Sequence, residues 1–451
     1  MNTNEIRISR AWLCGGLGLF FWAGLCASAG AYQLVAWGEA RENQNVVPGT
    51  VGEVTMAAAG KWHSLIANPE RTVVAWGGLV SSVTNVPPGL SEVLAISAGY
   101  EHCLALRSNG TVVAWGENGF GQTNVPAGLD FVRSIAAGSQ HNLALKWDGT
   151  IVAWGRSVDG SITIPPGLSN VVAVSCGNGF NVALRENGTV EAWGYDVGGV
   201  TTVPPGLSNV VAVSAGSAHV LALRENGTVV AWGQDSEGKI DVPPGLSNVV
   251  AIAAGGAHNL ALKSDWTVVA WGRTEEGQTT IPAGLSNVVA IASGSTSSRS
   301  MALVSTNIQT YYRDADGDGY GDPGVTTTGP LPPAGYVADN TDWNDNNKSV
   351  YPGAPEGPDG VDNNGNGQID EGARDAKTCF ALAQSIGSAG AGWSRTFVMD
   401  LTNFRNIMIQ DGYQNYTVNY LLYYNIWTGI YLFDYDVGAF TAVTWLTNLD
   451  L

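Results

Sequence analysis

Residues Gly99 to Gly116 read GYEHCLALRSNGTVVAWG, and close variants of this stretch return along most of the chain. The tripeptide Ala-Trp-Gly recurs every 39 residues, with its seven tryptophans at Trp37, Trp76, Trp115, Trp154, Trp193, Trp232 and Trp271. A second marker, a glycine that closes an Ala-Ala-Gly-like segment, recurs at the same 39-residue step, at Gly60, Gly99, Gly138, Gly177, Gly216, Gly255 and Gly294. Two markers that stay in phase over seven copies identify a repeat protein.

Each copy is predicted to form a small antiparallel sheet. In the copy from Val249 to Gly272, an apolar segment ends at Gly255, a second follows, and Thr267 to Gly272 forms a third. Several copies carry Asn-Gly or Asp-Gly between the last two segments, a pair that favours a tight hairpin turn. Small sheets repeated at this period indicate the blades of a propeller, with an open β-solenoid as the alternative.

The two ends of the repeat region favour a closed ring. A lone Trp strand, Gln33 to Gly38, precedes the first full copy, and the last copy lacks such a strand. We therefore expect an all-β, seven-bladed propeller over residues 32–308, in which the N-terminal strand closes the last blade and leaves no open edge. Residues Ile308 to Tyr312 are a competing candidate for the same place.

The pattern of Gly99 to Gly116 resembles the regulator of chromosome condensation repeat, over roughly Tyr32 to Asn307. The resemblance implies a seven-bladed propeller, and the compact copies, with Gly-Gln-Thr-Asn-Val-Pro at Gly121 to Pro126, resemble secreted bacterial relatives. It implies little about function, because this fold hosts unrelated tasks. Nucleotide exchange on a small GTPase, known for the family, is intracellular work and conflicts with the export signal described next.

Residues 1–31 are predicted to be an export signal. Arg7 and Arg10 precede an apolar run that ends in the small residues Ala27 to Ala31. We expect cleavage after Ala29 or Ala31, an extracellular or cell-surface protein, and no membrane span after cleavage. An uncleaved membrane anchor is the alternative.

The histidines are predicted to be structural. All five lie three residues after a marker glycine, at His63, His102, His141, His219 and His258, and the other two copies have Phe180 and Ser297 there. We expect these rings to pack and hydrogen-bond within the blades, and the seven repeat tryptophans to pack between blades with their N–H groups bonded. No histidine remains for a catalytic site, so we predict a protein that is not an enzyme. A propeller lyase or hydrolase is a less favoured alternative.

Function on a propeller is expected where the copies differ. Directly after the marker glycine, the first two copies place Lys61-Trp62 and Tyr100-Glu101, where later copies have smaller residues. Exposed aromatic side chains are common anchors of protein interfaces. We predict a partner-binding rim of Trp62, Tyr100, Glu101 and Phe120 on a monomeric propeller, with a protein or a surface glycan as partner. A structural envelope or adhesin component without a specific ligand is the alternative.

Residues 309–375 are predicted to bind calcium. From Asp314 to Asp375 there are eleven Asp and two Glu against Lys348 and Arg374, an excess of eleven negative charges in a chain of net charge −18. Carboxylates this dense repel one another unless a cation lies between them, and their hard oxygens suit calcium. The alternative is a solvated acidic linker. Outside this segment the sequence shows no basic patch, so nucleic acid is not expected as a partner.

Two stretches of this segment follow the start of an EF-hand calcium loop. The first begins at Asp314, with Val325 in place of the final Glu, and the second begins at Asp362. The predicted ligands, Tyr320 and Gln368 by their backbone carbonyls, are Asp314, Asp316, Asp318, Tyr320, Asp322, Asp339, Asp342, Asp345, Asp362, Asn364, Asn366, Gln368 and Asp370.

The acidic segment also resembles calcium-binding stalk repeats related to the thrombospondin type 3 repeat, in Tyr351 to Glu356 and in Asp362 to Asn364. That family usually has Cys where this chain has Trp343, Pro358 and Gly365. The resemblance therefore implies an irregular stalk without the usual disulfides and a stronger dependence on calcium. Residues 376–451 are expected to form a small β-rich region of unknown role.

Overall fold

The computed structural model describes residues 32–49, 51–78, 81–157, 160–355, 361–367, 406–411, 420–425, 429–434 and 439–442. The expected export signal and the expected ligands Gln368 and Asp370 lie outside these residues. The chain divides into two compact units: Met1–Gln309 with Gly329–Leu331, and Thr310–Thr328 with Pro332–Leu451. Among the described residues no helix is long and apolar enough to cross a bilayer.

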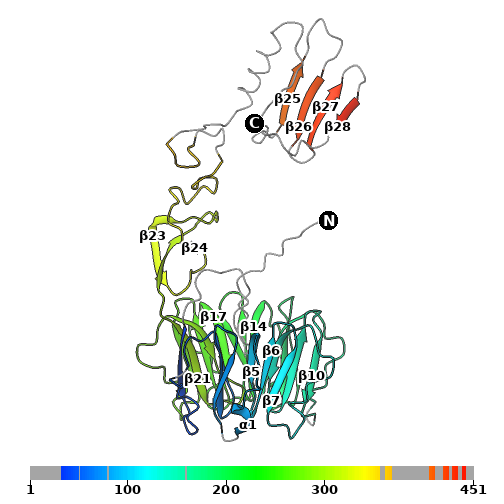
Figure 1. The fold of residues 1–451 in the computed structure, drawn as a ribbon, viewed down its shortest axis with the longest axis vertical. Coiled ribbons are helices and arrows are strands. Elements are labelled where there is room, and N and C mark those ends of the chain that lie inside the picture. The colour runs from blue at the N-terminus through cyan, green and yellow to red at the C-terminus, as the bar shows by residue number, and fades with distance from the viewer. Residues whose placement is uncertain are drawn as a thin grey trace. The chain divides into compact units, whose positions relative to one another are not determined.

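The first unit is a ring of seven three-stranded antiparallel sheets, the blades of a propeller (Figure 1). Six blades take three consecutive strands each: β2–β4 (Met56–Ala59, His63–Ala67, Val73–Gly77), β5–β7 (Val93–Ala98, His102–Arg107, Val112–Gly116), β8–β10 (Val132–Ala137, His141–Lys146, Ile151–Gly155), β11–β13 (Val171–Cys176, Phe180–Arg185, Val190–Gly194), β14–β16 (Val210–Ala215, His219–Arg224, Val229–Gly233) and β17–β19 (Val249–Ala254, His258–Lys263, Val268–Gly272). A four-residue helix, α1 (Ser81–Thr84), follows β4. The predicted all-β fold is confirmed.

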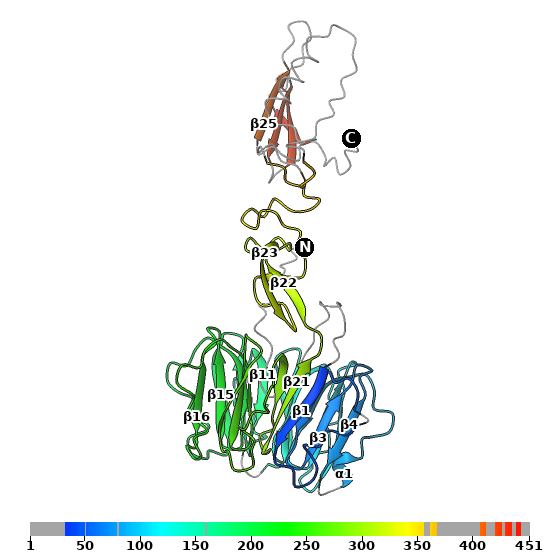
Figure 2. The same ribbon diagram turned by 90° about the vertical axis from the view of Figure 1, so that its left-hand side faces the viewer.

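The seventh blade closes the ring with the N-terminal strand, as predicted. β1 (Tyr32–Gly38) pairs with β21 (Arg299–Ser305), which pairs in turn with β20 (Val288–Ala292). Figure 2 shows β1 in dark blue beside β21, and both β20 and β21 contact β2 of the first blade. The competing segment is not used for closure, because β22 (Gln309–Arg313) pairs instead with β23 (Asp322–Gly329) and β24 (Tyr336–Val337).

The marker glycines are required by close packing between blades. A Cβ atom on Gly99 would clash with the ring of His102 and would lie 2.5 Å from the carbonyl oxygen of Gly138 in the next blade. The glycine of Ala-Trp-Gly has a different reason, since Gly116 has a φ of 103°, which side chains other than glycine rarely adopt.

The histidines link neighbouring blades, in agreement with their predicted structural role. His102 Nε2 lies 2.6 Å from Asn142 Oδ1 of the next blade, and two further pairs repeat this contact: His141 with Asn181 at 2.8 Å and His219 with Asn259 at 2.7 Å. Where Phe180 replaces the histidine, Val220 of the next blade takes the position of the asparagine, and both residues are buried. At this contact between blades, an apolar residue in place of the histidine is therefore matched by an apolar residue in place of the asparagine.

The last blade departs from the prediction at this position. Gly38 pairs with Arg299 in the register in which Gly272 pairs with His258, so Arg299, and not Ser297, takes the histidine's place. The Arg299 side chain is fully buried. Its Nη2 donates to the carbonyl oxygens of Gly60 at 3.0 Å and His63 at 2.6 Å, and its Nη1 donates to that of Lys61 at 3.3 Å. This arginine ties the last blade to the first.

All seven repeat tryptophans are buried between blades. Four indole N–H groups donate to a backbone carbonyl oxygen at 2.9 to 3.0 Å, those of Trp37, Trp115, Trp154 and Trp232. Trp76, Trp193 and Trp271 have no acceptor for this group within the described part of the chain, so the expected N–H bond is not general.

The second unit contains two small sheets. The first is formed by β22, β23 and β24, with β22 in the middle. The second is an antiparallel sheet of β25 (Asn406–Asp411), β26 (Tyr420–Asn425), β27 (Gly429–Asp434) and β28 (Ala439–Ala442), paired in chain order. It confirms the β-rich character expected for the C-terminal region.

Candidate functional site

One face of the propeller is built from the turns that join the first and second strands of each blade, and we call it the turn face. Successive turns are linked around the ring, because the N–H group of Lys61 donates to Gly99, that of Tyr100 to Ser139, and that of Asn178 to Ser217. The residue after each Ala-Trp-Gly lies beside these turns, as in Glu117, whose N–H donates to the carbonyl oxygen of Glu101 at 2.8 Å. The turns and these flanking residues therefore share one surface.

Two aromatic residues of the turn face, Trp62 and Phe120, are paired with cations. Lys61 Nζ lies 4.9 Å from the centre of the Trp62 ring, and the Arg156 guanidinium lies 5.5 Å from that of Phe120. Arg156 also donates to Oε1 of Gln140, in the turn of the third blade, at 2.9 Å. Arg156 therefore connects Phe120 to that turn. Cation–π pairs of this kind stabilise exposed rings by about 0.5–1 kcal/mol. They hold the rings in place while leaving them accessible.

The predicted rim residues lie together on the turn face. Trp62, Tyr100 and Glu101 are partly buried and Phe120 is 47 % exposed. Burial, with the neighbouring carboxylate of Glu117, raises the pKa of Glu101. The sequence interpretation missed Tyr195, which is 53 % exposed and occupies in the fourth blade the place of Arg156 in the third. Its position directly after Ala-Trp-Gly is the signal that identifies it.

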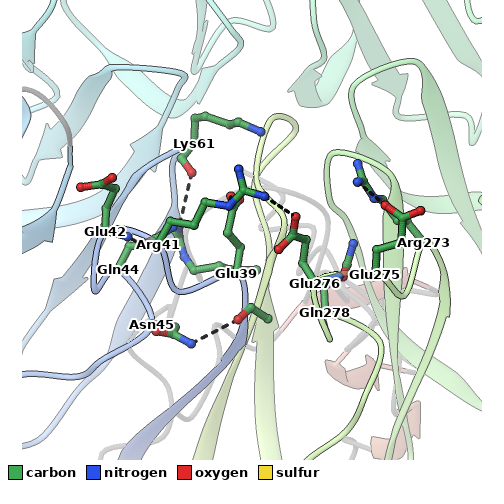
Figure 3. A network of polar contacts seen from close by, with 12 residues as sticks. Glu39, Arg41, Glu42, Gln44, Asn45, Lys61, Arg273, Glu275, Glu276 and Gln278 are labelled. Atoms are coloured by element: carbon green, nitrogen blue, oxygen red, sulfur yellow. Dashed lines mark hydrogen bonds and ion pairs between the residues drawn. The ribbon is translucent and has the colours of Figure 1, made fainter.

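The part of the turn face around the last blade is charged rather than aromatic. Figure 3 shows Arg41 in the loop after β1 and Arg273 in the loop after β19, each among glutamates. Arg41 pairs with Glu276 at 2.9 Å and with Glu39 at 3.3 Å, and Arg273 pairs with Glu275 at 2.5 Å. The cations of these blades are neutralised by carboxylates, whereas Lys61 and Arg156 lie over aromatic rings.

A second candidate site lies in the second unit, in the acidic loop after β22. Asp314, Asp316 and Asp318 place one carboxylate oxygen each within 4.8 Å of one another. Asp314 accepts the N–H groups of Gly317 at 2.7 Å and Gly319 at 3.1 Å. Both glycines have a positive φ, so the chain curls around the carboxylates.

The loop at Asp362 repeats this geometry. Asp362 accepts the N–H group of Gly365 at 2.8 Å through Oδ1 and that of Gly367 at 2.7 Å through Oδ2. Asn364 Oδ1 accepts the N–H group of Asn366 at 3.0 Å. The two loops predicted from sequence therefore have the same fold as far as Gly367.

Three carboxylate oxygens of the first loop and its surroundings fit a bound cation. Oδ2 of Asp316, Asp318 and Asp342 are buried and have no hydrogen-bond partner among the described residues. Burial and the nearby carboxylate of Asp318 raise the pKa of both Asp316 and Asp342. An unpaired buried carboxylate is costly, and a cation bound at the cluster of Asp314, Asp316 and Asp318 would reduce that cost.

The other predicted ligands in this part of the chain differ from these three in their exposure or in their contacts. Asp345 is buried, but its oxygens accept from Arg313 Nε at 2.9 Å and from the N–H group of Ala315 at 2.6 Å. Asp339 is exposed and accepts the N–H group of Thr341 at 2.9 Å, and Asp322 accepts that of Gly324 at 2.7 Å. Tyr320 stacks on the ring of Tyr351, with centroids 5.3 Å apart.

Comparison with known families agrees with the repeat. Residues 93–122, 132–161, 171–199, 210–239 and 249–278 match the model of the regulator of chromosome condensation (RCC1) repeat. The propeller is RCC1-like. No curated protein matches the chain.

Solved structures show the same fold. The structure of Prp20p from Saccharomyces cerevisiae, described with its binding properties to Gsp1p and histones, is similar with a TM-score of 0.54 and 17 % identity, covering 62 % of this chain and 93 % of that chain. The structure of Kap60 bound to yeast RCC1 (Prp20) matches with a TM-score of 0.53 and 17 % identity, over 62 % of this chain and 90 % of that one. At this identity the likeness concerns the fold alone.

The acidic segment has a match of its own. Residues 342–371 match a family model described as a metal-binding motif, under the name Cu-binding MopE. The match covers the second loop and begins at Asp342, so the first loop at Asp314 lies outside it. A metal-binding motif and an acidic cluster are therefore both present, and neither identifies the metal.

Proposed function

We propose that the chain is a secreted or cell-surface binding protein, whose RCC1-like propeller binds a protein partner through the aromatic part of the turn face and whose acidic segment binds calcium. The observation that carries the first half is the cluster of Trp62, Tyr100, Phe120 and Tyr195 on one face, with Lys61 and Arg156 over two of the rings. Aromatic and arginine side chains dominate the binding energy of protein interfaces. The solved RCC1-like structure with Kap60 is that of a propeller bound to a protein.

Catalysis by histidine is not favoured. The five histidines are buried in the contacts between blades, and burial lowers the pKa of His63 and His258 to about 3. Such rings are neutral at pH 7 and are enclosed by the repeat. Binding, which needs only a rigid surface, fits the propeller better than a lyase or hydrolase reaction does.

We expect the double variant Trp62→Ala and Tyr100→Ala to lose partner binding by at least about a hundredfold, since hot-spot aromatics contribute about 2 kcal/mol or more each. The full chain, immobilised, would be exposed to an extracellular and envelope extract of its source, and the bound proteins quantified by mass spectrometry. The affinity of any protein enriched on the wild type would then be measured by titration against both chains.

Trp147→Ala is the matched control for this experiment. Trp147 is 61 % exposed and has Arg133 at 5.9 Å over its ring. It lies in the β9–β10 hairpin, at the other end of β9 from the turn face. A partner retained by Trp147→Ala and lost by the double variant supports the proposal. A partner retained by both, or no saturable partner at all, contradicts it and favours a structural role.

Calcium is favoured over copper by the chemistry of the ligands. The acidic segment contains no His, Cys or Met, the soft or imidazole ligands that copper prefers. It offers carboxylate, amide and backbone oxygens, which calcium binds with six to eight ligands. The repeated loop geometry at Asp314 and Asp362 is that of two similar cation sites.

Removing calcium is expected to increase proteolysis between Tyr312 and Asp375, because the uncompensated carboxylates repel one another and loosen the loops. Limited digestion of the full chain would be compared with chelator, with millimolar calcium, and with copper in place of calcium. Cleavage suppressed by calcium alone supports the assignment. Equal digestion with and without calcium contradicts it, and protection by copper alone identifies a copper site.

A further inference from the structure

The first loop lacks one ligand that its pattern requires. An EF-hand loop ends with a carboxylate that supplies two oxygens, and this chain has Val325 there, within β23. Asp314, Asp316 and Asp318 supply three carboxylates, and calcium takes six to eight oxygens. A loop with this gap needs an oxygen from elsewhere in the chain.

Asp342 is placed to supply it. Its side chain is 1 % exposed, and its backbone N–H donates to the carbonyl oxygen of Gly321 at 3.3 Å, so it lies against the end of the first loop. Its Oδ1 accepts the N–H group of Asn344 at 2.7 Å. Its Oδ2 is buried with no partner in the described chain, as are Oδ2 of Asp316 and Asp318 in the loop.

Neighbouring carboxylates do not meet the same conditions. Asp345 is also buried, but Arg313 and the N–H group of Ala315 use its two oxygens. It fixes the segment that carries Asp342 to the beginning of the loop. Asp339 is exposed to solvent.

We propose that Asp342 is the side chain that completes the first cation site, so that the site is closed by a residue 28 positions beyond Asp314, the residue that begins it. The proposal rests on the proposed binding of calcium. It separates Asp342, a ligand, from Asp345, a residue that positions it. It also places the first residue of the matched metal-binding motif in the preceding site, and so links the two loops.

The test is calcium titration of the full chain by calorimetry, with variants of similar size. Asp342→Asn keeps the Oδ1 acceptor and removes the charge, and it is expected to weaken one class of sites by at least about tenfold. Asp130→Asn, at an exposed aspartate of the propeller, is the control and is expected to leave both classes unchanged. In the Asp314→Asn background, Asp342→Asn is expected to leave the class of sites that Asp314→Asn does not affect unchanged, because both residues serve one ion.

A second readout distinguishes a ligand from a merely structural carboxylate. With chelator present, Asp342→Asn is expected to slow proteolysis of the acidic segment relative to the wild type, because it removes an unpaired buried charge. A structural aspartate would give faster proteolysis.

The outcomes separate this inference from the function on which it rests. Absence of calcium binding by the wild type rejects the proposed calcium site itself. Normal binding by Asp342→Asn rejects the inference alone. If Asp342→Asn weakens the class of sites that Asp362→Asn weakens, and not the class that Asp314→Asn weakens, the inference is rejected in favour of a role for Asp342 in the second loop.

Discussion

Lowering the pH from 7 to 4 is expected to unfold the propeller, through its histidines. Burial lowers the pKa of His102 and His219 from 6.5 to about 4, and that of His63 and His258 to about 3. In this pH range the unfolded chain binds protons that the folded chain excludes, so acid favours unfolding. The full stability is present above about pH 6.5 and is lost as the pH falls toward the lowered values.

The expected loss is large because the four groups act together. One pKa unit corresponds to about 1.4 kcal/mol, so each histidine removes about 3 kcal/mol at pH 4. The sum is on the order of 10 kcal/mol, comparable with the whole free energy of unfolding of a typical domain. Denaturant unfolding followed by tryptophan fluorescence at pH 7, 6, 5 and 4 would measure how the free energy of unfolding changes with pH.

The chain itself supplies the control for this experiment. Phe180 of the fourth blade and Val220 of the fifth take the places of a His–Asn pair, so the double variant His219→Phe with Asn259→Val copies a pair that the fold already accepts. Its loss of stability between pH 7 and 4 is expected to be about 3 kcal/mol smaller than that of the wild type. Identical pH profiles would show that acid acts through other groups.

Repeat phase explains why the propeller could be predicted so closely. A residue such as His102 or Trp115 recurs at one structural position, and its recurrence identifies the position as structural without any contact being known. The 39-residue period no longer assigns structural positions correctly where the copies differ in length. The extra residues near Ser297 hid the fact that Arg299 takes the histidine's place, and only the pairing of Gly38 with Arg299 reveals it.

The candidate sites were predicted less completely, because they depend on contacts that phase does not encode. Trp62 and Tyr100 could be found as departures from the repeat, but Arg156 reaches Phe120 from the neighbouring blade. For the acidic segment, composition alone was enough to predict oxygen ligands. The difference between Asp342 and Asp345 required knowing which oxygens the backbone and Arg313 already occupy.

Replacing Arg299 by Met is expected to destabilise the propeller by about 3 kcal/mol or more. The variant keeps most of the side-chain volume but leaves the carbonyl oxygens of Gly60 and Lys61 without their charged donor, in a place closed to water. Burial also lowers the pKa of Arg299 to about 9, and the carboxylate of Glu39 partly offsets this. The free energy of unfolding at pH 7, from denaturant titration, would measure the effect.

Arg41→Met, in the loop that joins the last blade to the first, is the matched control. Arg41 has a side chain that is 64 % exposed and pairs with Glu276 (Figure 3), so its loss is expected to change stability by at most about 1 kcal/mol. Hydrogen exchange of the backbone amides in β1 and β21 would add a local measurement. If Arg299 holds the last blade to the first, its loss should accelerate exchange in these two strands more than in the strands of the other blades. If Arg299→Met matched Arg41→Met in both measurements, strand pairing between β1 and β21 alone would suffice to close the ring. If it is several kcal/mol less stable, closure needs the buried arginine as well, which would account for an arginine at the histidine position of the blade that is completed by a distant strand.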